Sequence, residues 1–250
     1  MKCKVLAVSA ALSLLGTTGP LQAGGVEYSE AFAQQVEQYI LDNPDIVLKA
    51  LILLEEREEA AKLSKDAEAI SRNATKLFGE DMKSGAPYVT VFVDYQCGYC
   101  KMAEPQVIAA QGRLPSLNVR YVQFPILGEI STEAAKFAES VRLIYGEQLY
   151  SAMHEHLMTG DVREPGAFKK AAQEFDLNYG DLEAEMRGQA VEQKIRENHQ
   201  LARALGITGT PGFVFPTKII RGMANEQQII DIATAETSRV CSEDNGCVLR

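Results

Sequence analysis

The chain has 250 residues, of which 46% are hydrophobic and 24% are charged, and its net charge is −9. This composition is ordinary for a globular protein and excludes a disordered chain, a collagen and a small disulfide-stapled scaffold. The excess of acidic residues argues against sequence-independent binding to nucleic acid, which needs a basic surface against the phosphates. The length predicts one or two domains that bury their own cores.

Residues 1–23 have the three-part pattern of a secretory signal peptide. Two lysines precede an apolar run from Val5 to Leu15, and the segment ends in Ala23. Because this run is too short to span a bilayer stably, we predict a cleaved signal and a periplasmic protein. Cleavage removes Cys3, so four cysteines remain in two close pairs, a count that predicts disulfide chemistry in an exported protein.

Residues 24–78 are predicted to be a helical oligomerisation region. One face of the first helix is apolar, and a wide apolar stripe follows from Ile46 to Leu54. Spacings of four and three residues then form a short heptad seam, which consists of Leu63, Ala67, Ile70, Ala74 and Leu77. The alternative interpretation of this seam is a helix that packs on its own catalytic domain. Residues 79–87, with two glycines and a proline, predict a linker.

Residues 88–250 are predicted to form the catalytic domain, with an α/β or α+β layered fold. The continuous apolar run Tyr88–Val93 is typical of a buried strand, and a second strand is predicted over 119–124. Residues 131–205 are predicted to be almost entirely helical. A hairpin over 213–220 and a last helix over 225–238 complete the expected elements.

The pair Cys97 and Cys100 lies where the first strand ends and a helix begins. Free N–H groups and the positive end of the helix dipole favour the thiolate form of Cys97 over the thiol. Cys100 lies one helical turn later on the same side, so it is able to close on a mixed disulfide. This pattern predicts thiol–disulfide exchange.

Two other uses of the cysteines remain open. A zinc site with Cys241 and Cys247 as its second half fits poorly, because the five residues between them exceed the usual ligand spacing. Copper(I) binding by the first pair is chemically reasonable, because soft thiolates suit that ion. For Cys241 and Cys247 we predict a structural disulfide, with a redox relay to the first pair as the alternative. No metal ligand set and no cofactor are predicted.

Three motifs, in this order, resemble the DsbA-like thioredoxin-fold proteins. They are Phe92–Lys101, Phe124–Gly128 and Leu205–Val214. The resemblance covers about residues 88–238 and implies an α/β thioredoxin fold with a helical insertion at about 131–205. It implies that Cys97 is the nucleophile and Cys100 the resolving thiol. It also implies a substrate-binding surface, for which we name Thr210, a cis Pro211, Gly98 and Tyr99.

The N-terminal helices extend this resemblance to the suppressor-of-copper-sensitivity C group (ScsC), which has trimeric disulfide isomerases as well as monomeric members. This second resemblance rests on the segment Asn43–Leu51, the charged helix after it and the CGYC motif. We therefore expect a homo-oligomeric isomerase, with a trimer favoured. Its partners are expected to be protein thiols and disulfides and a membrane thiol reductase. A monomeric dithiol oxidase and a copper-binding periplasmic module are the alternatives.

Other polar residues give weaker signals. His154 and His156 point to different faces of one predicted helix, so with His199 they are expected to be structural or solvated. Asp94 is expected either to tune the Cys97 thiolate or shuttle protons, or to be a solvated acid at a strand end. Lys101 is expected to add positive potential near Cys97.

Overall fold

The computed structural model describes residues 29–80, 82, 86–164, 166–237, 239–242 and 246–249. The predicted signal peptide and Cys3 lie outside these residues. The helices are α1 (Glu30–Asp42), α2 (Asp45–Arg72), α3 (Ala74–Phe78), α4 (Gly98–Arg113), α5 (Glu129–Tyr145), α6 (Glu147–Thr159), α7 (Ala167–Glu174), α8 (Tyr179–Met186), α9 (Gln189–Ala204) and α10 (Glu226–Thr237). The strands are β1 (Tyr88–Val93), β2 (Asn118–Gln123), β3 (Gly212–Val214), β4 (Ile219–Arg221), β5 (Arg239–Ser242) and β6 (Gly246–Leu249).

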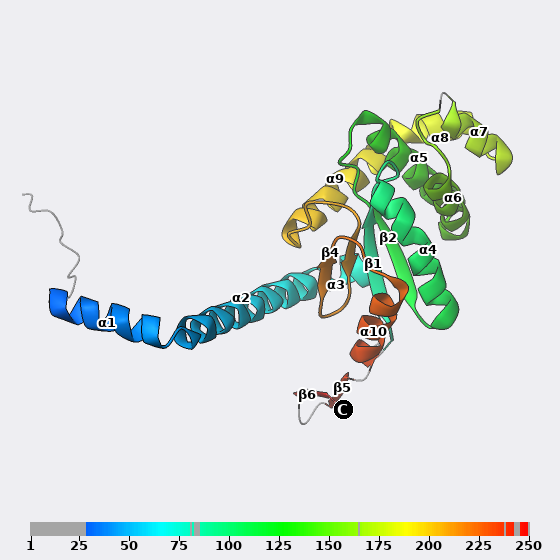
Figure 1. Cartoon of the computed structure of the whole chain (residues 1–250). Coiled ribbons are helices and arrows are strands. Elements are labelled where there is room, and N and C mark those ends of the chain that lie inside the picture. Colours follow the sequence, from blue (N-terminus) through cyan, green and yellow to red (C-terminus); the bar gives the residue numbers. More distant parts are fainter. Residues whose placement is uncertain are drawn as a thin grey trace, which may run out of the picture. The chain divides into compact units, whose positions relative to one another are not determined.

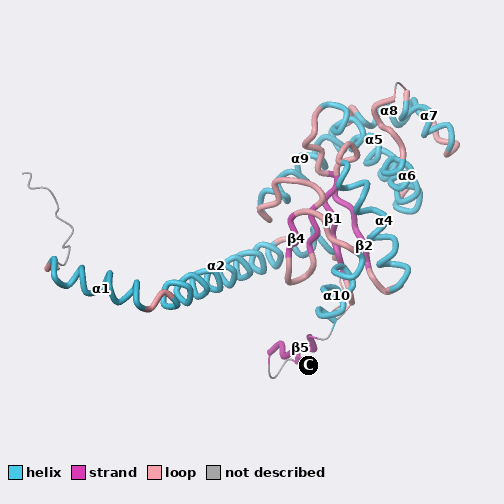
Figure 2. Tube along the Cα trace, in the orientation of Figure 1, coloured by secondary structure: helices cyan, strands magenta, loops and turns pink. Residues whose placement is uncertain are grey.

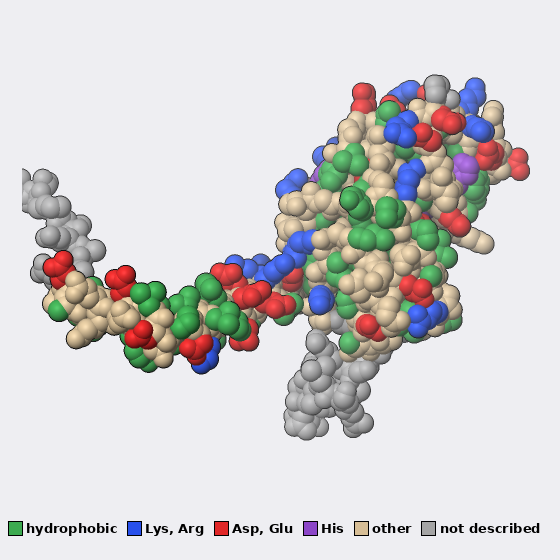
Figure 3. All heavy atoms as spheres, in the orientation of Figure 1, with side chains coloured by type: hydrophobic (Ala, Val, Ile, Leu, Met, Phe, Trp, Pro, Cys, Tyr) green, Lys and Arg blue, Asp and Glu red, His purple; other side chains and the backbone are tan. Residues whose placement is uncertain are grey.

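The chain divides between Glu56 and Arg57 into two compact units. The first contains α1 and the beginning of α2. Helix α1 starts at an N-cap, where the Ser29 hydroxyl accepts a hydrogen bond from the Phe32 amide at 3.2 Å. None of the described residues of this unit is buried, and its apolar side chains alternate with acidic ones on the face seen in Figure 3.

The second unit is built on a four-stranded sheet with the order β2-β1-β3-β4. Strand β1 pairs with β2 in parallel and with β3 antiparallel, and β3 pairs antiparallel with β4 (Figures 1 and 2). All six residues of β1 are buried, because both faces of the sheet are covered. The predicted strands and hairpin are thus confirmed: β1 has the predicted bounds, and the ends of β2 and of the hairpin are shifted by one residue.

Each face of β1 belongs to a different apolar core. Val89, Val91 and Val93 pack in the larger core, which includes residues of α4 and α10. Phe92 lies in the second core with Leu205 and residues of α2, α3 and α9. Alternate side chains of a strand point to opposite faces, so the two cores hold β1 between two layers of helices.

The predicted heptad seam does not form one continuous exposed stripe. Leu63 is 43% exposed, whereas Ile70 and Leu77 are 1% and 0% exposed in the second core. For these two buried residues the alternative interpretation is correct, because they pack on the sheet of their own chain. The break in the helix at Asn73, between α2 and α3, lets both helices contribute to that core.

The helical insertion comprises α5 to α9 and connects β2 to β3, as predicted. Helix α5 contacts α6, α8 and α9, so it is the central helix of the insertion. Among the described residues no helix has both the length and the apolar character needed to cross a membrane.

Candidate active site

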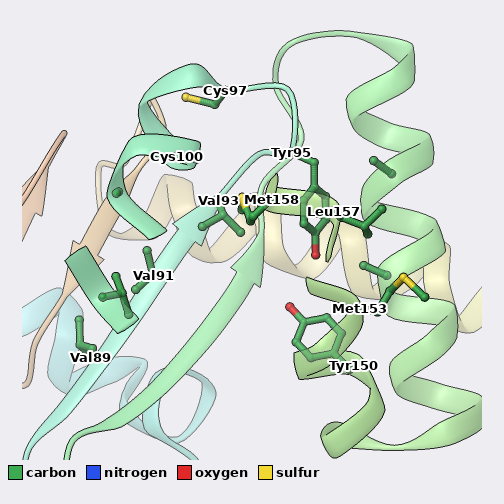
Figure 4. Packing of buried hydrophobic residues seen from close by; sticks show 14 of the residues in the cluster. Val89, Val91, Val93, Tyr95, Cys97, Cys100, Tyr150, Met153, Leu157 and Met158 are labelled. Atoms are coloured by element: carbon green, nitrogen blue, oxygen red, sulfur yellow. The ribbon is translucent and has the colours of Figure 1, made fainter. Parts of the chain in front are cut away.

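The two cysteines lie at the carboxyl end of β1, where α4 begins. Cys97 is the N-cap residue of α4, with extended backbone angles, and its amide donates to the Asp94 carbonyl oxygen at 3.0 Å. Figure 4 shows Cys97 and Cys100 at the end of β1 toward which Val89, Val91 and Val93 lead. Both cysteines are free thiols in this structure, and they are 7% and 1% exposed. The predicted strand-to-helix junction is therefore present.

The two thiols have different surroundings. Burial is the main cause that raises the pKa of Cys100 far above its ordinary value. Cys97 lies at the start of the helix, and its thiol donates to the Thr210 carbonyl oxygen with an Sγ–O distance of 3.3 Å. Cys100 is thus kept as a thiol, and the Cys97 thiol contacts the loop before β3.

That loop connects α9 to β3 and contains a cis peptide bond between Thr210 and Pro211, so the expected cis proline is confirmed. Antiparallel pairing of Gly212 with Phe92 brings the loop beside the end of β1. A Cβ atom on Gly212 would lie 3.1 Å from the Ile207 Cγ2 atom, so the close packing of the loop on β3 explains this glycine.

Asp94 is buried rather than solvated, which corrects one of the two expectations for it. Its Oδ1 accepts from the Gln96 amide at 2.8 Å. Its Oδ2 accepts from the amides of Ile126 and Leu127 at 2.8 and 3.1 Å. The carboxylate therefore joins the turn before Cys97 to the loop between β2 and α5.

An apolar rim lies on the surface at the start of α4 and on the loop that Asp94 binds. It consists of Tyr99, Met102, Ile126 and Leu127, which are 65%, 60%, 37% and 51% exposed. Gly98 is also exposed, and no atom outside its neighbourhood lies within 4 Å of a Cβ placed there. The surface around Cys97 is thus open and rich in large apolar side chains.

A buried polar network, which sequence reasoning missed, connects the turn before Cys97 to β2, α4 and α6. The Gln123 amide donates to the hydroxyl oxygens of Tyr95 and Tyr150 at 3.0 and 2.8 Å, and these hydroxyls point toward one another in Figure 4. Tyr95 also bonds His154 Nδ1 at 2.9 Å. His154 Nε2 lies 3.5 Å from Glu104 Oε2. No sequence signal joined these residues, because they lie on β2, in the turn after β1, on α4 and on α6.

Comparison with known proteins places this architecture in a family. The family model described as a DSBA-like thioredoxin domain matches residues 88–145 and 138–232, which is more than half of the chain. The chain belongs to the DsbA-like thioredoxin family. Membership of this family supports a thiol–disulfide oxidoreductase activity for the chain. A search of curated proteins gave no match.

Several solved structures of other proteins are similar to this chain. A thioredoxin-like oxidoreductase from Silicibacter pomeroyi DSS-3 is 31% identical, with a TM-score of 0.57, 64% of this chain covered and 95% of the other. ScsC of Proteus mirabilis in a transitional conformation is 22% identical, with a TM-score of 0.60 and coverage of 84% and 95%. BcfH of Salmonella enterica Typhimurium is 22% identical, with a TM-score of 0.63 and coverage of 82% and 95%.

The histidines of this DsbA-like domain are structural or partly solvated, as expected. His154 is buried, and its ring packs at a tilt against Tyr121 with ring centroids 3.8 Å apart. His156 is half-buried, and His199 packs edge-on against Phe124. Within the described part of the chain, no three His, Cys, Asp or Glu residues form a metal-binding group. Lys101 donates from Nζ to the Gly160 carbonyl oxygen, which ties the first turn of α4 to the end of α6.

The C-terminal cysteines lie on a hairpin of their own. Strands β5 and β6 pair antiparallel, with Cys241 directly opposite Cys247 in the backbone register. The side chains of this hairpin lie outside the described residues, so the disulfide between them stays a prediction.

Proposed function

We propose that this chain is an exported thiol–disulfide oxidoreductase in which Cys97 is the nucleophile and Cys100 the resolving thiol. The observation that carries the proposal is the position of Cys97 as the N-cap of α4, beside the cis-proline loop. As the N-cap residue, Cys97 stands at the end of α4 that carries free N–H groups and the positive end of the helix dipole. Burial raises the pKa of Cys100, so Cys100 stays protonated until the mixed disulfide has formed.

The electrons balance in two exchanges. The Cys97 thiolate attacks a substrate disulfide, forms a mixed disulfide and releases one substrate thiolate. Cys100 then loses its proton and attacks the Cys97 sulfur, which releases the second substrate thiolate. The substrate gains two electrons, and the chain loses two as the Cys97–Cys100 disulfide forms. In isomerisation, a substrate thiol attacks instead and regenerates the Cys97 thiolate.

The substrate in this proposal is an extended segment of a protein. Thr210 and Pro211 supply the backbone surface beside the Cys97 sulfur, and the open position at Gly98 leaves room for a second chain. The apolar rim around Cys97 suits the apolar residues that misfolded proteins expose.

Cysteine variants of the mature chain test this chemistry. Cys97→Ser is expected to abolish reduction of insulin disulfides. Cys100→Ser is expected to keep the first attack and to accumulate a mixed disulfide that a reductant releases, visible on a non-reducing gel. Cys241→Ser serves as the control and is expected to remain active. Full activity of Cys97→Ser would overturn the assignment of the nucleophile.

We propose further that the protein is a homo-oligomeric isomerase, with a trimer favoured. In support, the described residues of the first unit have no buried side chain, and large apolar residues from both of its helices are exposed. These include Phe32, Val36, Ile40, Leu48, Leu51 and Leu54. Association of copies buries such faces, and several active sites around one substrate favour disulfide rearrangement over single transfer.

Truncation tests the oligomer, and the position of the cut matters. Asp66, Ile70 and Leu77 belong to the catalytic unit, so the shortened chain begins at Arg57 rather than after Phe78. Light scattering is expected to give an oligomer for residues 24–250 and a monomer for residues 57–250. The short form is expected to reduce insulin but to lose the refolding of scrambled ribonuclease. A monomer in both cases would instead favour the monomeric oxidase.

Export and partners complete the proposal. Sequencing the N-terminus of protein recovered from a periplasmic extract is expected to start at Gly24. An isomerase must be kept reduced, so a membrane thiol reductase is the expected electron donor. Peptide mapping without reductant is expected to find Cys241 linked to Cys247.

A further inference from the structure

The cis-proline loop is held at both of its ends by two adjacent residues of one neighbouring segment. At the end of the loop, the Gly222 amide donates to the Pro211 carbonyl oxygen at 3.0 Å. At its start, the Arg221 guanidinium donates from Nη2 to the Leu205 carbonyl oxygen at 2.7 Å. The same group donates from Nε to the Gly206 carbonyl oxygen at 2.9 Å. Residues 221 and 222 thus bond to both ends of the loop that contains Thr210.

Arg221 is itself fixed by Asp66, which lies 155 residues earlier in the chain on α2. Two bonds join the side chains, Nη1 to Oδ2 at 2.9 Å and Nη2 to Oδ1 at 2.7 Å. The Asp66 side chain is only 10% exposed and that of Arg221 is 29% exposed. This bidentate geometry fixes the plane of the guanidinium, which a single hydrogen bond does not do.

The start of the loop is shaped to receive this arginine. Gly206 has a φ of +62°, and Arg221 Nη2 lies 3.4 Å from the position of a Cβ atom there. A side chain at residue 206 would therefore meet both backbone strain and the guanidinium. Asp66 and Ile70 are the buried residues of α2, one turn apart, so the helix that supplies the carboxylate is anchored in the core beside it.

We propose that Asp66 and Arg221 are positioning residues for thiol–disulfide exchange, which hold the cis-proline loop in the conformation that binds an extended protein substrate beside Cys97. The inference rests on the proposed function, because it takes Thr210 and Pro211 as the substrate surface. Neither side chain touches the reacting sulfur atoms. Their effect is on binding of the polypeptide, because Arg221 contacts the loop at residues 205 and 206, whereas Cys97 is held by α4 and bonds to the loop at Thr210.

Asp66→Asn and Arg221→Lys in the mature chain test the proposal. Each is expected to raise KM for a disulfide-containing peptide about tenfold with little change in kcat. Alkylation of Cys97 by iodoacetamide, which involves no bound polypeptide, is expected to keep its wild-type rate. The matched control is Glu226→Gln, which removes the exposed 2.9 Å ion pair between Arg113 and Glu226 and is expected to leave KM unchanged.

A charge-swapped double variant, Asp66→Arg with Arg221→Asp, separates positioning from stability. It restores opposite charges but supplies no donor to the Leu205 and Gly206 carbonyl oxygens, so KM is expected to stay high even where thermal stability recovers. An unchanged KM in Arg221→Lys, or a loss of peptide turnover matched by an equal loss of Cys97 alkylation, would overturn the inference. Failure of the proposed function itself looks different, because the wild-type chain would then not reduce the peptide.

Discussion

The Cys97 thiol donates to the carbonyl oxygen of Thr210 across 3.3 Å, although 113 residues separate the two in the chain. Parallel and antiparallel pairing around β1 brings them together. The carboxyl end of β1 carries Cys97, and the first residue of β3 pairs with Phe92 near that same end. The sheet register therefore sets the distance between the nucleophile and the loop that precedes β3.

The Asp94 carboxylate is expected to be a structural anchor of the active site. Asp94→Asn leaves one acceptor oxygen and turns an amide group toward N–H donors. We therefore expect a loss of about 1–3 kcal/mol in the free energy of unfolding, measured with urea. Asp161→Asn is the control, because that carboxylate bonds Arg163 on the surface, and little change is expected. An Asp94→Asn protein as stable as the wild type would contradict this role.

The two halves of the heptad seam are expected to respond differently to truncation of their side chains. Ile70→Ala opens a cavity in the second core and is expected to lower the free energy of unfolding of the catalytic unit by about 2–5 kcal/mol. Leu63→Ala removes a side chain that is 43% exposed and is expected to leave that unit unchanged while weakening the oligomer. Urea unfolding and light scattering on both variants measure this, and equal unfolding effects would refute it.

Cys100 is expected to make the reduced protein less stable in alkali. Its pKa is raised in the folded state by burial, so the unfolded chain releases this proton first, above about pH 8.5. The stabilisation is complete below that pH and is lost as the pH rises. The difference in free energy of unfolding between the wild type and Cys100→Ser, both kept reduced, is expected to shrink by about 1 kcal/mol between pH 7.5 and 9.5. A constant difference would contradict the raised pKa.

The Tyr95 hydroxyl is expected to stabilise the network behind the cysteines. Tyr95→Phe leaves both the Gln123 amide and His154 Nδ1 short of a buried partner. The expected loss is about 1–3 kcal/mol in the free energy of unfolding. Tyr99→Phe, at a side chain that is 65% exposed, serves as the matched control and is expected to behave as the wild type.

The sequence by itself determined the family and the order of the elements from β1 to α10. A buried apolar run followed by two cysteines one turn apart is a local pattern, and local patterns are carried by neighbouring residues. The strand Tyr88–Val93, the helix after Cys97 and the helical insertion were predicted on that basis and are present. Burial of Asp94 escaped the same reasoning, because its partners are 32 and 33 residues away.

Only the tertiary structure decided which residues surround the cysteines. Ile70 fits a coiled-coil seam and a domain core equally well, because both bury the same face of a helix. Packing on β1 settles which of the two it does. The pair Asp66 and Arg221 and the pair Tyr95 and His154 have no local signature, since each joins segments far apart in the chain. Such contacts arise when the sheet register and the helix packing bring two polar groups into one buried volume, where each must find a partner.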